Sequence, residues 1–228
     1  MNKENNWIKE LHSIKLVDKN QKGIYSQFGE EPLFDFIFDN IGTTNKFLVD
    51  FGAGGLGCKM SNSRYLMEKG WKGLRMDGEP DPDTDIKKEF ITQENIVSLF
   101  EKYKVPLEFD FLSIDIDGND FWVLGKILEK YSPRLIVAEF NGTIPNGISK
   151  VMKYNPNHSW ESNDYYGFSF EAGKKLAKSF DYSVVFQLHS TNMYLIRKDL
   201  IDWQDDFGVT YTPFQYHAHS PNREWINI

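Results

Sequence analysis

A short apolar run leads directly into a glycine-rich stretch in the segment Phe47-Leu-Val-Asp-Phe-Gly-Ala-Gly-Gly-Leu-Gly57. This order predicts a buried strand that ends in a tight turn, with a helix after it. Glycine has no Cβ, so backbone N–H groups of such a turn can approach a ligand closely. Gly52, Gly54 and Gly57 satisfy the G-x-G-x-x-G spacing of dinucleotide sites. The segment therefore favours an α/β fold with a nucleotide-like ligand.

A carboxylate before the glycines changes which ligand they suit. Asp50 stands two residues before Gly52, at the carboxyl end of the expected strand. Its charge would repel the pyrophosphate of a dinucleotide, whereas a ligand with positive charge or hydroxyl groups could use it. S-adenosylmethionine carries an ammonium and a sulfonium, so the residues favour that cofactor. NAD remains the alternative.

Strand and helix patterns alternate regularly from residue 30 to residue 197. Such alternation predicts a Rossmann-like three-layer α/β sandwich, with a mostly parallel sheet and helices on both faces. The last two strands flank a polar run and are expected to form a hairpin, which would put an antiparallel strand at the sheet edge. The expected strands are 47–51, 73–77, 90–91, 109–116, 135–140, 182–188 and 193–197, and the expected helices are 30–41, 61–69, 93–102, 120–130 and 171–180.

We expect residues 1–228 to form a single domain, because 228 residues with 40% hydrophobic content suffice for one sizeable core. Residues 1–26 are expected to add an N-terminal helix and loop. Residues 141–167 lack periodicity, and a loop of this length is usually functional, so a substrate-side loop or lid is expected there. Residues 202–228 form a tail to which the sequence assigns no structure.

Charge and cysteine content limit the partners and the compartment. The formal net charge is −7 and no long run of Lys or Arg occurs, so a small or neutral substrate fits better than nucleic acid. Cys58 is the single cysteine, which excludes an internal disulfide and favours a reducing, cytoplasmic setting. No apolar run approaches the roughly 20 residues that span a bilayer. The oligomeric state stays open.

Polar residues follow the expected strands at the edge where open α/β sheets bind ligands. Asp77 ends the second strand 20 residues after Gly57, which is the spacing of an acid that accepts hydrogen bonds from ribose hydroxyls. The fourth and fifth strands also end in polar groups, so we expect the acids to converge at one edge. These further residues are Asp115, Asp117, Glu139 and Asn141.

The order of strand, acid, glycine-rich turn, helix, strand and acid resembles that of class I S-adenosylmethionine-dependent methyltransferases. Residues 112–120 (LSIDIDGND) are similar to the K-I-D-x-E-G-x-E segment of the FkbM-like branch, and residues 26–30 (SQFGE) to a segment before its first strand. The chain departs from that branch in having Ser113 for Lys, and Asp117 and Asp120 for Glu. The resemblance covers roughly residues 26–200.

This resemblance implies methyl transfer from S-adenosylmethionine, commonly to a hydroxyl of a sugar, glycan or natural product. It also implies a seven-stranded sheet whose last strand is antiparallel. By position, Asp50, Gly52 and Gly54 would line the methionine end of the cofactor. Asp77 would contact the ribose, and Asp115 would lie near the transferred methyl group. The acceptor is not implied.

A hydroxyl is a poor nucleophile near neutral pH, so O-methylation needs a general base or a metal ion that lowers the hydroxyl pKa. Asp117, Glu139 and Asn141 are candidate ligands of Mg²⁺ or another divalent cation, because such cations prefer oxygen donors. The alternative is that Asp117 and Gly118 form a turn and that Asp120 opens the next helix.

Three residues are candidates for the catalytic group. Asp115 ends the fourth strand, His158 lies in the irregular loop, and His189 lies in the polar run of the expected hairpin. Each histidine has a structural alternative, because a lone histidine is more often structural. His217 and His219 in the tail are expected at most to bind metal adventitiously.

Two functions of other classes remain alternatives. An NAD-dependent oxidoreductase would use the same glycine turn, although no Tyr-x-x-x-Lys pair follows the fourth or fifth strand. A non-catalytic module would bind a nucleotide-like ligand or a partner protein. Affinity for S-adenosylhomocysteine but not for NAD would separate the methyltransferase from both.

Overall fold

The central feature of the computed structural model is a seven-stranded sheet with the order β3-β2-β1-β4-β5-β8-β7. The model describes residues 6–18, 25–53, 61–82, 84–202, 207–215 and 217–228. The strands of this sheet are β1 (Phe47–Phe51), β2 (Lys72–Asp77), β3 (Lys87–Lys88), β4 (Glu108–Ile114), β5 (Ser132–Glu139), β7 (Tyr182–Leu188) and β8 (Asn192–Arg197).

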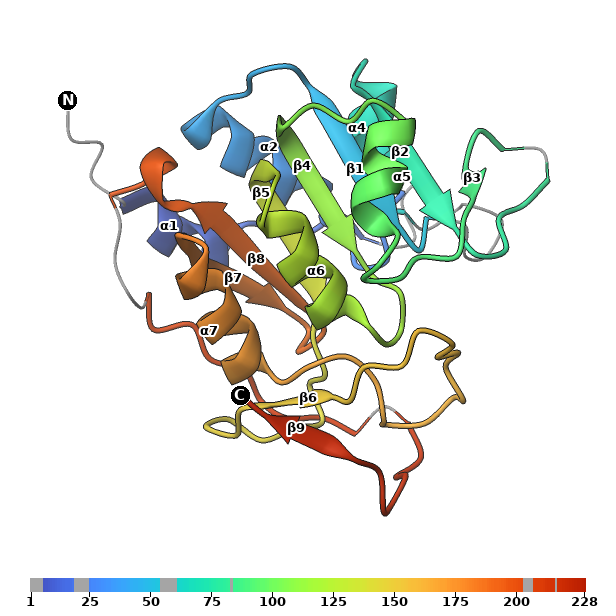
Figure 1. Cartoon of the computed structure of the whole chain (residues 1–228). Coiled ribbons are helices and arrows are strands. Elements are labelled where there is room, and N and C mark those ends of the chain that lie inside the picture. Colours follow the sequence, from blue (N-terminus) through green and yellow to red (C-terminus); the bar gives the residue numbers. More distant parts are fainter. Residues whose placement is uncertain (1–5, 19–24, 54–60, 83, 203–206, 216) are drawn as a thin grey trace.

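Strand direction agrees with the predicted mostly parallel sheet. The pairs of β1 with β2, β1 with β4, β2 with β3 and β4 with β5 are all parallel. The last strand of the sheet in chain order, β8, runs antiparallel to both β5 and β7. The predicted hairpin therefore exists, but its antiparallel strand lies inside the sheet and β7 forms the edge. The carboxyl ends of β1, β2 and β4 point toward one side of the molecule (Figure 1).

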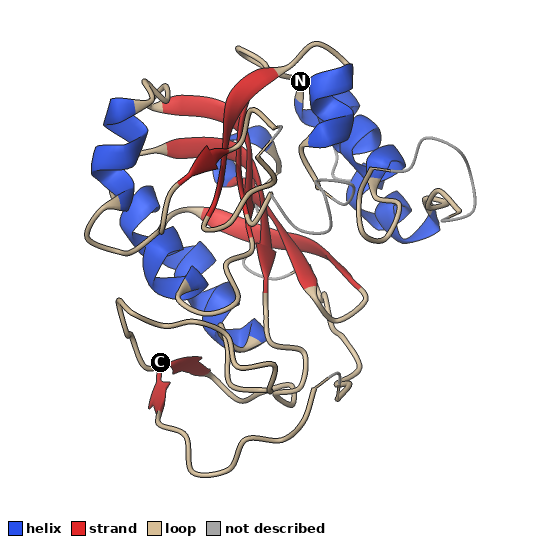
Figure 2. Ribbon diagram, turned by 90° about the vertical axis from the view of Figure 1, so that its right-hand side faces the viewer, coloured by secondary structure: helices blue, strands red, loops and turns tan. Residues whose placement is uncertain are grey.

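Helices cover both faces of the sheet, which gives the predicted three layers (Figure 2). One apolar core joins one face to α5, α6 and α7, and a second joins the other face to α1 and α2. In β5, Leu135 and Val137 enter the second core while Ile136 and Ala138 enter the first. Both faces are buried, so the strand is a continuous apolar run. The helices are α1 (Asn6–Glu10), α2 (Glu31–Ile41), α4 (Arg64–Glu68), α5 (Ile96–Lys102), α6 (Asp120–Leu128) and α7 (Phe170–Ser179), with short 3-10 turns at Leu11–Ser13 and Lys198–Leu200.

The predicted third strand is displaced. The sequence placed it at residues 90–91, whereas β3 is Lys87–Lys88 at the sheet edge. Exposed lysines suit an edge strand, because they discourage pairing with another chain. Phe90 is 55% exposed, and both it and Ile91 line a cavity instead of joining the ladder. An apolar pair alone does not distinguish a strand from the wall of a site.

Two strands that the sequence did not predict connect the irregular loop with the tail. β6 (Lys150–Met152) lies within residues 141–167 and pairs antiparallel with β9 (Trp225–Asn227). Figure 1 shows this pair beyond the carboxyl edge of the main sheet. Each strand has three residues, which is too short for an alternating pattern to be recognised. No helix among the described residues has both the length and the apolar content needed to cross a bilayer.

Candidate functional site

A cavity of about 470 Å³ opens at the carboxyl edge of the main sheet. Its walls come from the ends of β1, β2 and β4, from the segment after β3 and from residues 158–160. Ligands of open α/β sheets bind at this edge. The predicted substrate-side loop thus supplies one wall. The described lining residues are Gly52, Asp77, Gly78, Glu79, Glu89, Phe90, Ile91, Asp115, Ile116, Asp117, Asn119, His158, Ser159 and Trp160.

Gly52 lies where the chain leaves β1 and passes close to the end of β4. Its φ is +70°, in the left-handed region, and a Cβ there would lie 2.0 Å from the backbone oxygen of Asp115. Any side chain would therefore push the two strand ends apart. Gly54, which was also predicted to bind the cofactor, lies outside the described residues, as do Gly57 and Cys58.

Asp50 is 2% exposed and faces two serines rather than the described lining of the cavity. Ser61 Oγ donates to its Oδ2 at 2.7 Å and Ser63 Oγ donates to the same oxygen at 2.6 Å. Burial raises the pKa of Asp50, although the serine hydrogen bonds oppose this shift. In this structure the carboxylate fixes residues 61–63 beside the end of β1. Its predicted contact with the cofactor stays a prediction.

Asp77 is the last residue of β2 and lines the cavity, where the sequence placed the acid for ribose. Its Oδ1 accepts a hydrogen bond of 2.7 Å from the backbone N–H of Glu79. This contact turns the chain immediately after the strand and fixes the carboxylate at the edge of the cavity.

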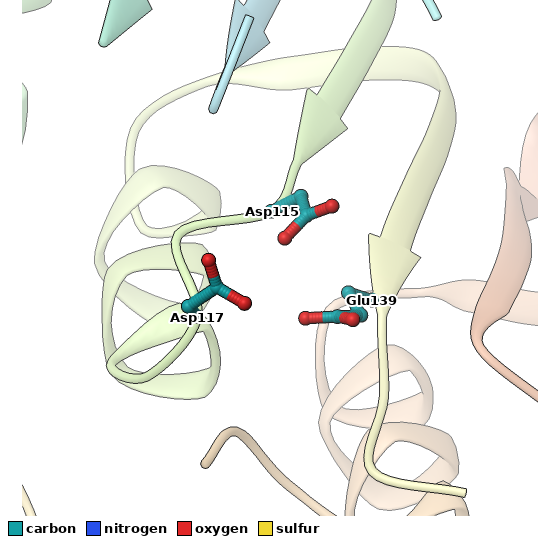
Figure 3. A group of neighbouring side chains, drawn as sticks. All are labelled: Asp115, Asp117 and Glu139. Atoms are coloured by element: carbon teal, nitrogen blue, oxygen red, sulfur yellow. The ribbon is translucent and has the colours of Figure 1, made fainter. Parts of the chain in front are cut away.

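Three carboxylates converge at the ends of β4 and β5. One oxygen from each of Asp115, Asp117 and Glu139 lies within 4.8 Å of the other two. Figure 3 shows the three groups directed toward a common space. Glu139 Oε2 is buried and has no hydrogen-bond partner among the described residues. Such an atom carries a desolvation cost that a bound cation would remove.

Burial and mutual repulsion perturb these acids. Burial, followed by the charges of Asp117 and Asp120, raises the pKa of Asp115 to about 8. Burial and then the charge of Asp115 raise the pKa of Glu139 well above its ordinary range. Asp115 therefore holds a proton near neutral pH unless a cation replaces it.

The loop after β4 aims Asp117 into this group. Asp117 has a φ of +54°, in the left-handed region. Asp120 is fully buried, and it accepts hydrogen bonds from Ile116 N at 2.8 Å and Gly118 N at 2.9 Å. Burial raises the pKa of Asp120 to about 6. Asp120 also begins α6. The turn and helix start that were the alternative to a metal site are thus present together with the carboxylate group.

Asn141 is hydrogen-bonded at both ends of its side-chain amide. Its Nδ2 donates to the backbone oxygens of Asp164 and Tyr166, both at 2.9 Å. Its Oδ1 accepts from Thr143 N at 3.1 Å and from Thr143 Oγ1 at 2.5 Å. An amide oxygen has two lone pairs, and both are used. In this structure Asn141 therefore holds the loop together, and its role as a metal ligand stays a prediction.

The two candidate histidines lie in different surroundings. His158 lines the cavity, and its Nε2 is 3.2 Å from the backbone oxygen of Asp117. A Cβ at Gly118 would lie 2.2 Å from His158 Cδ2, so glycine permits this approach. His189 has a φ of +53° in the β7–β8 turn, and its ring centroid is 4.6 Å from that of Phe28. The structure brings His158, and not His189, to the described wall of the cavity.

The sequence did not place the tail near the site. The His217 ring lies 4.7 Å from the Trp160 ring and 6.0 Å from the Tyr166 ring. Burial raises the pKa of Asp117, while the charges of His217 and His158 act in the opposite direction. No sequence signal identifies this proximity, because His217 and Trp160 are 57 positions apart.

Comparisons with known proteins found similar solved structures but no similar family model. No protein-family model matches the chain, and no curated protein matches it significantly. Among solved structures, it is similar to the N-terminal domain of EvdMO1, which was crystallised with SAH bound. The sequence identity is 9%, the TM-score is 0.40, and the similarity covers 83% of this chain and 93% of that one.

Proposed function

We propose that this chain is an S-adenosylmethionine-dependent O-methyltransferase. Its acceptor would be a hydroxyl of a sugar, a glycan or a small natural product, and a divalent cation would assist. The observation that carries the proposal is the cavity bounded by Gly52, Asp77 and Asp115 at the ends of three adjacent parallel strands. A reducing, cytoplasmic setting and the lack of a nucleic-acid partner stay predictions.

The lining of the cavity suits S-adenosylmethionine better than NAD. Asp77 can accept hydrogen bonds from ribose hydroxyls, and Phe90 and Ile91 offer an apolar wall to the base. The described lining contains five carboxylates and no Lys or Arg. That charge favours a sulfonium and an ammonium, and it disfavours a pyrophosphate. This contrast argues against the oxidoreductase alternative.

The residues also fit a divalent cation. Asp115, Asp117 and Glu139 would hold it, since hard cations prefer several oxygen donors and Glu139 Oε2 lacks a hydrogen-bond partner among the described residues. A bound cation would lower the pKa of an acceptor hydroxyl. Asp120 keeps Asp117 in place through its bonds to the loop. The protein would chiefly position the acceptor oxygen in line with the methyl group.

His158 is the group best placed to accept the proton of the hydroxyl. If its Nε2 carries a hydrogen, this nitrogen donates to the backbone oxygen of Asp117, and Nδ1 presents a lone pair. A neutral imidazole fixed in this way can act as a general base. His158→Ala should lower methyl transfer from labelled S-adenosylmethionine by about 100-fold without weakening S-adenosylhomocysteine binding. Unchanged turnover would remove His158 as the base.

Calorimetry and thermal unfolding with S-adenosylhomocysteine and with NAD test the proposal. We expect S-adenosylhomocysteine to bind and to raise the melting temperature, and NAD to do neither. Binding of NAD alone would favour the oxidoreductase. Binding of neither compound would favour a module that recognises a partner.

A further inference from the structure

A second hollow lies on the other side of residues 158–160. It has a volume of about 680 Å³, and its walls come from the loop after β6 and from the tail before β9. We call this hollow the groove, and we call the cavity at the carboxyl edge of the main sheet, which is lined by five acidic residues, the acidic cavity. Residues 158–160 line both of them. A molecule in the groove could therefore reach the cavity across a wall of three residues. The groove residues are 153–161, 165 and 222–224.

The groove and the cavity differ in charge. The described lining of the cavity has five carboxylates and no Lys or Arg. The groove has two cations and two acids, and each cation is paired with an acid. Lys153 Nζ lies 2.9 Å from Glu224 Oε2, and Arg223 is bonded to Glu161. The groove is thus polar and electrically balanced, which suits a neutral polar ligand and not a phosphate.

Aromatic rings line the groove in fixed positions. Tyr165 Oη donates to the backbone oxygen of Glu224 at 2.6 Å, and its ring centroid is 5.1 Å from that of Trp225. Trp160 Nε1 donates to the backbone oxygen of Asn163 at 2.9 Å. Arg223 lies over the Tyr165 ring, 5.4 Å from its centroid, and so covers part of that ring. The partly exposed Trp160 ring, whose polar atom is already bonded, offers carbon surface that is ordered before a ligand arrives.

Asparagine side chains also line the groove. Asn157 and Asn222 are exposed, and no described protein group hydrogen-bonds to either side-chain amide. Each amide provides two donors and an acceptor. Ring carbons together with amides match a molecule that has an apolar face and a rim of hydroxyl groups. That description fits a sugar ring.

We propose that this groove binds a neutral saccharide unit of the acceptor and presents a hydroxyl across residues 158–160 to the acidic cavity. The inference rests on the proposed methyl transfer for the role of the hydroxyl, but not for binding itself. Both cations among the described groove residues are already paired with acids, so the phosphate of a phosphorylated sugar would find no free positive charge there. The acceptor is therefore a glycan or a free sugar rather than a sugar phosphate or a nucleotide sugar.

A glycan array tests this inference. The labelled full chain, with S-adenosylhomocysteine present, is applied to printed neutral, sialylated, sulfated and phosphorylated glycans. We expect binding to neutral glycans only. The double variant Asn157→Ala with Asn222→Gly should lose at least about 10-fold of that signal, the effect of removing one or two hydrogen bonds. Glycine suits position 222 because the φ of Asn222 is 62°.

Lys104→Gly is the matched control. Lys104 has a φ of 58° and is not among the groove residues, so its replacement should leave glycan binding unchanged. The inference is overturned if no neutral glycan binds, if anionic glycans bind as well as neutral ones, or if the double variant binds like the wild type. Calorimetry with S-adenosylhomocysteine separates the two proposals. Cofactor binding without glycan binding would refute only the proposed saccharide site. Glycan binding without cofactor binding would refute only the proposed methyltransferase function.

Discussion

Strand β4 has one aspartate near each end, and the two have opposite surroundings. Asp110 is fully buried near the start of the strand. Its carboxylate accepts hydrogen bonds from Thr44 N at 2.8 Å, Asn45 N at 3.0 Å and Lys46 N at 2.6 Å, and Arg134 Nε lies 3.6 Å away. Donors and positive charge compensate the cost of burying this carboxylate.

Asp115 directly follows the other end of the strand and has acids as neighbours. Asp117 and Glu139 supply negative charge where Asp110 receives N–H groups. A satisfied carboxylate holds the fold together, whereas a group of repelling carboxylates costs stability and implies a ligand. The amino end of β4 thus holds a carboxylate with all its bonds made, whereas its carboxyl end holds the acids to which we propose that a cation binds. Four experiments test this division.

Asp110→Ala should have the largest effect. It leaves the buried N–H groups of residues 44–46 without their acceptor, so we expect the free energy of unfolding to fall by about 3–5 kcal/mol. Urea denaturation measures the loss. Asp110→Asn retains one oxygen acceptor and should lose less. A loss below about 1 kcal/mol for Asp110→Ala would remove the structural role from the amino end.

Divalent cation should have the second largest effect, at the other end of the strand. Mg²⁺ or Mn²⁺ at 100 times its dissociation constant should raise the free energy of unfolding by about 3 kcal/mol. Glu139→Gln should abolish this gain, because it removes one of the three ligand charges. Glu79→Gln, in the same cavity but outside the group of three, should retain it. Equal stability with cation and with chelator would show that the group binds no metal.

Stability in chelator should depend on pH through Asp115. Its pKa is about 8 in the folded chain, against 3.8 for the free group. Between these values the folded state holds a proton that the unfolded state has lost, so stability falls as pH rises toward 8. We expect a loss of about 3 kcal/mol from pH 6 to pH 9, measured by urea denaturation. Asp115→Asn should flatten the profile, and an equally steep profile in that variant would contradict the assignment.

Asp77→Asn should have the smallest effect, which is confined to cofactor affinity. Loss of the charge opposite the ribose hydroxyls should weaken S-adenosylhomocysteine binding by about 10-fold, or about 1.4 kcal/mol. Calorimetry measures this change, and the melting temperature without ligand should stay near that of the wild type. Asp81→Asn, an exposed acid four residues later, is the control. Equal weakening in both variants would indicate a general effect of charge.

Most of the main sheet could be predicted from the sequence because its strands are buried on both faces. The apolar residues that follow one another in β1, β4 and β5 indicate this burial, because both sides of each strand face a core. The displaced third strand shows the limit of such a signal, because Phe90 and Ile91 are apolar without belonging to the ladder. β6 and β9 escaped prediction because each depends on a partner more than 70 residues away.

The positions of the acidic residues in the site could also be predicted from local sequence. The strand ends fix where Asp77, Asp115, Asp117 and Glu139 lie, since parallel strands finish at one edge. The hydrogen bonds of Asn141 could not be predicted, because their partners include the distant loop that contains Asp164. No local sequence pattern predicts the groove or the position of His217. Their positions depend on how the tail returns to the loop, which sequence spacing does not encode.

The pairing of β9 with β6 has a consequence for biosynthesis. Residues 222–227 are made after every strand of the main sheet and after the loop that they meet. A nascent chain halted before them already contains the described walls of the acidic cavity, yet it lacks one side of the neighbouring groove. The described walls of the acidic cavity are therefore synthesised before the last side of the groove.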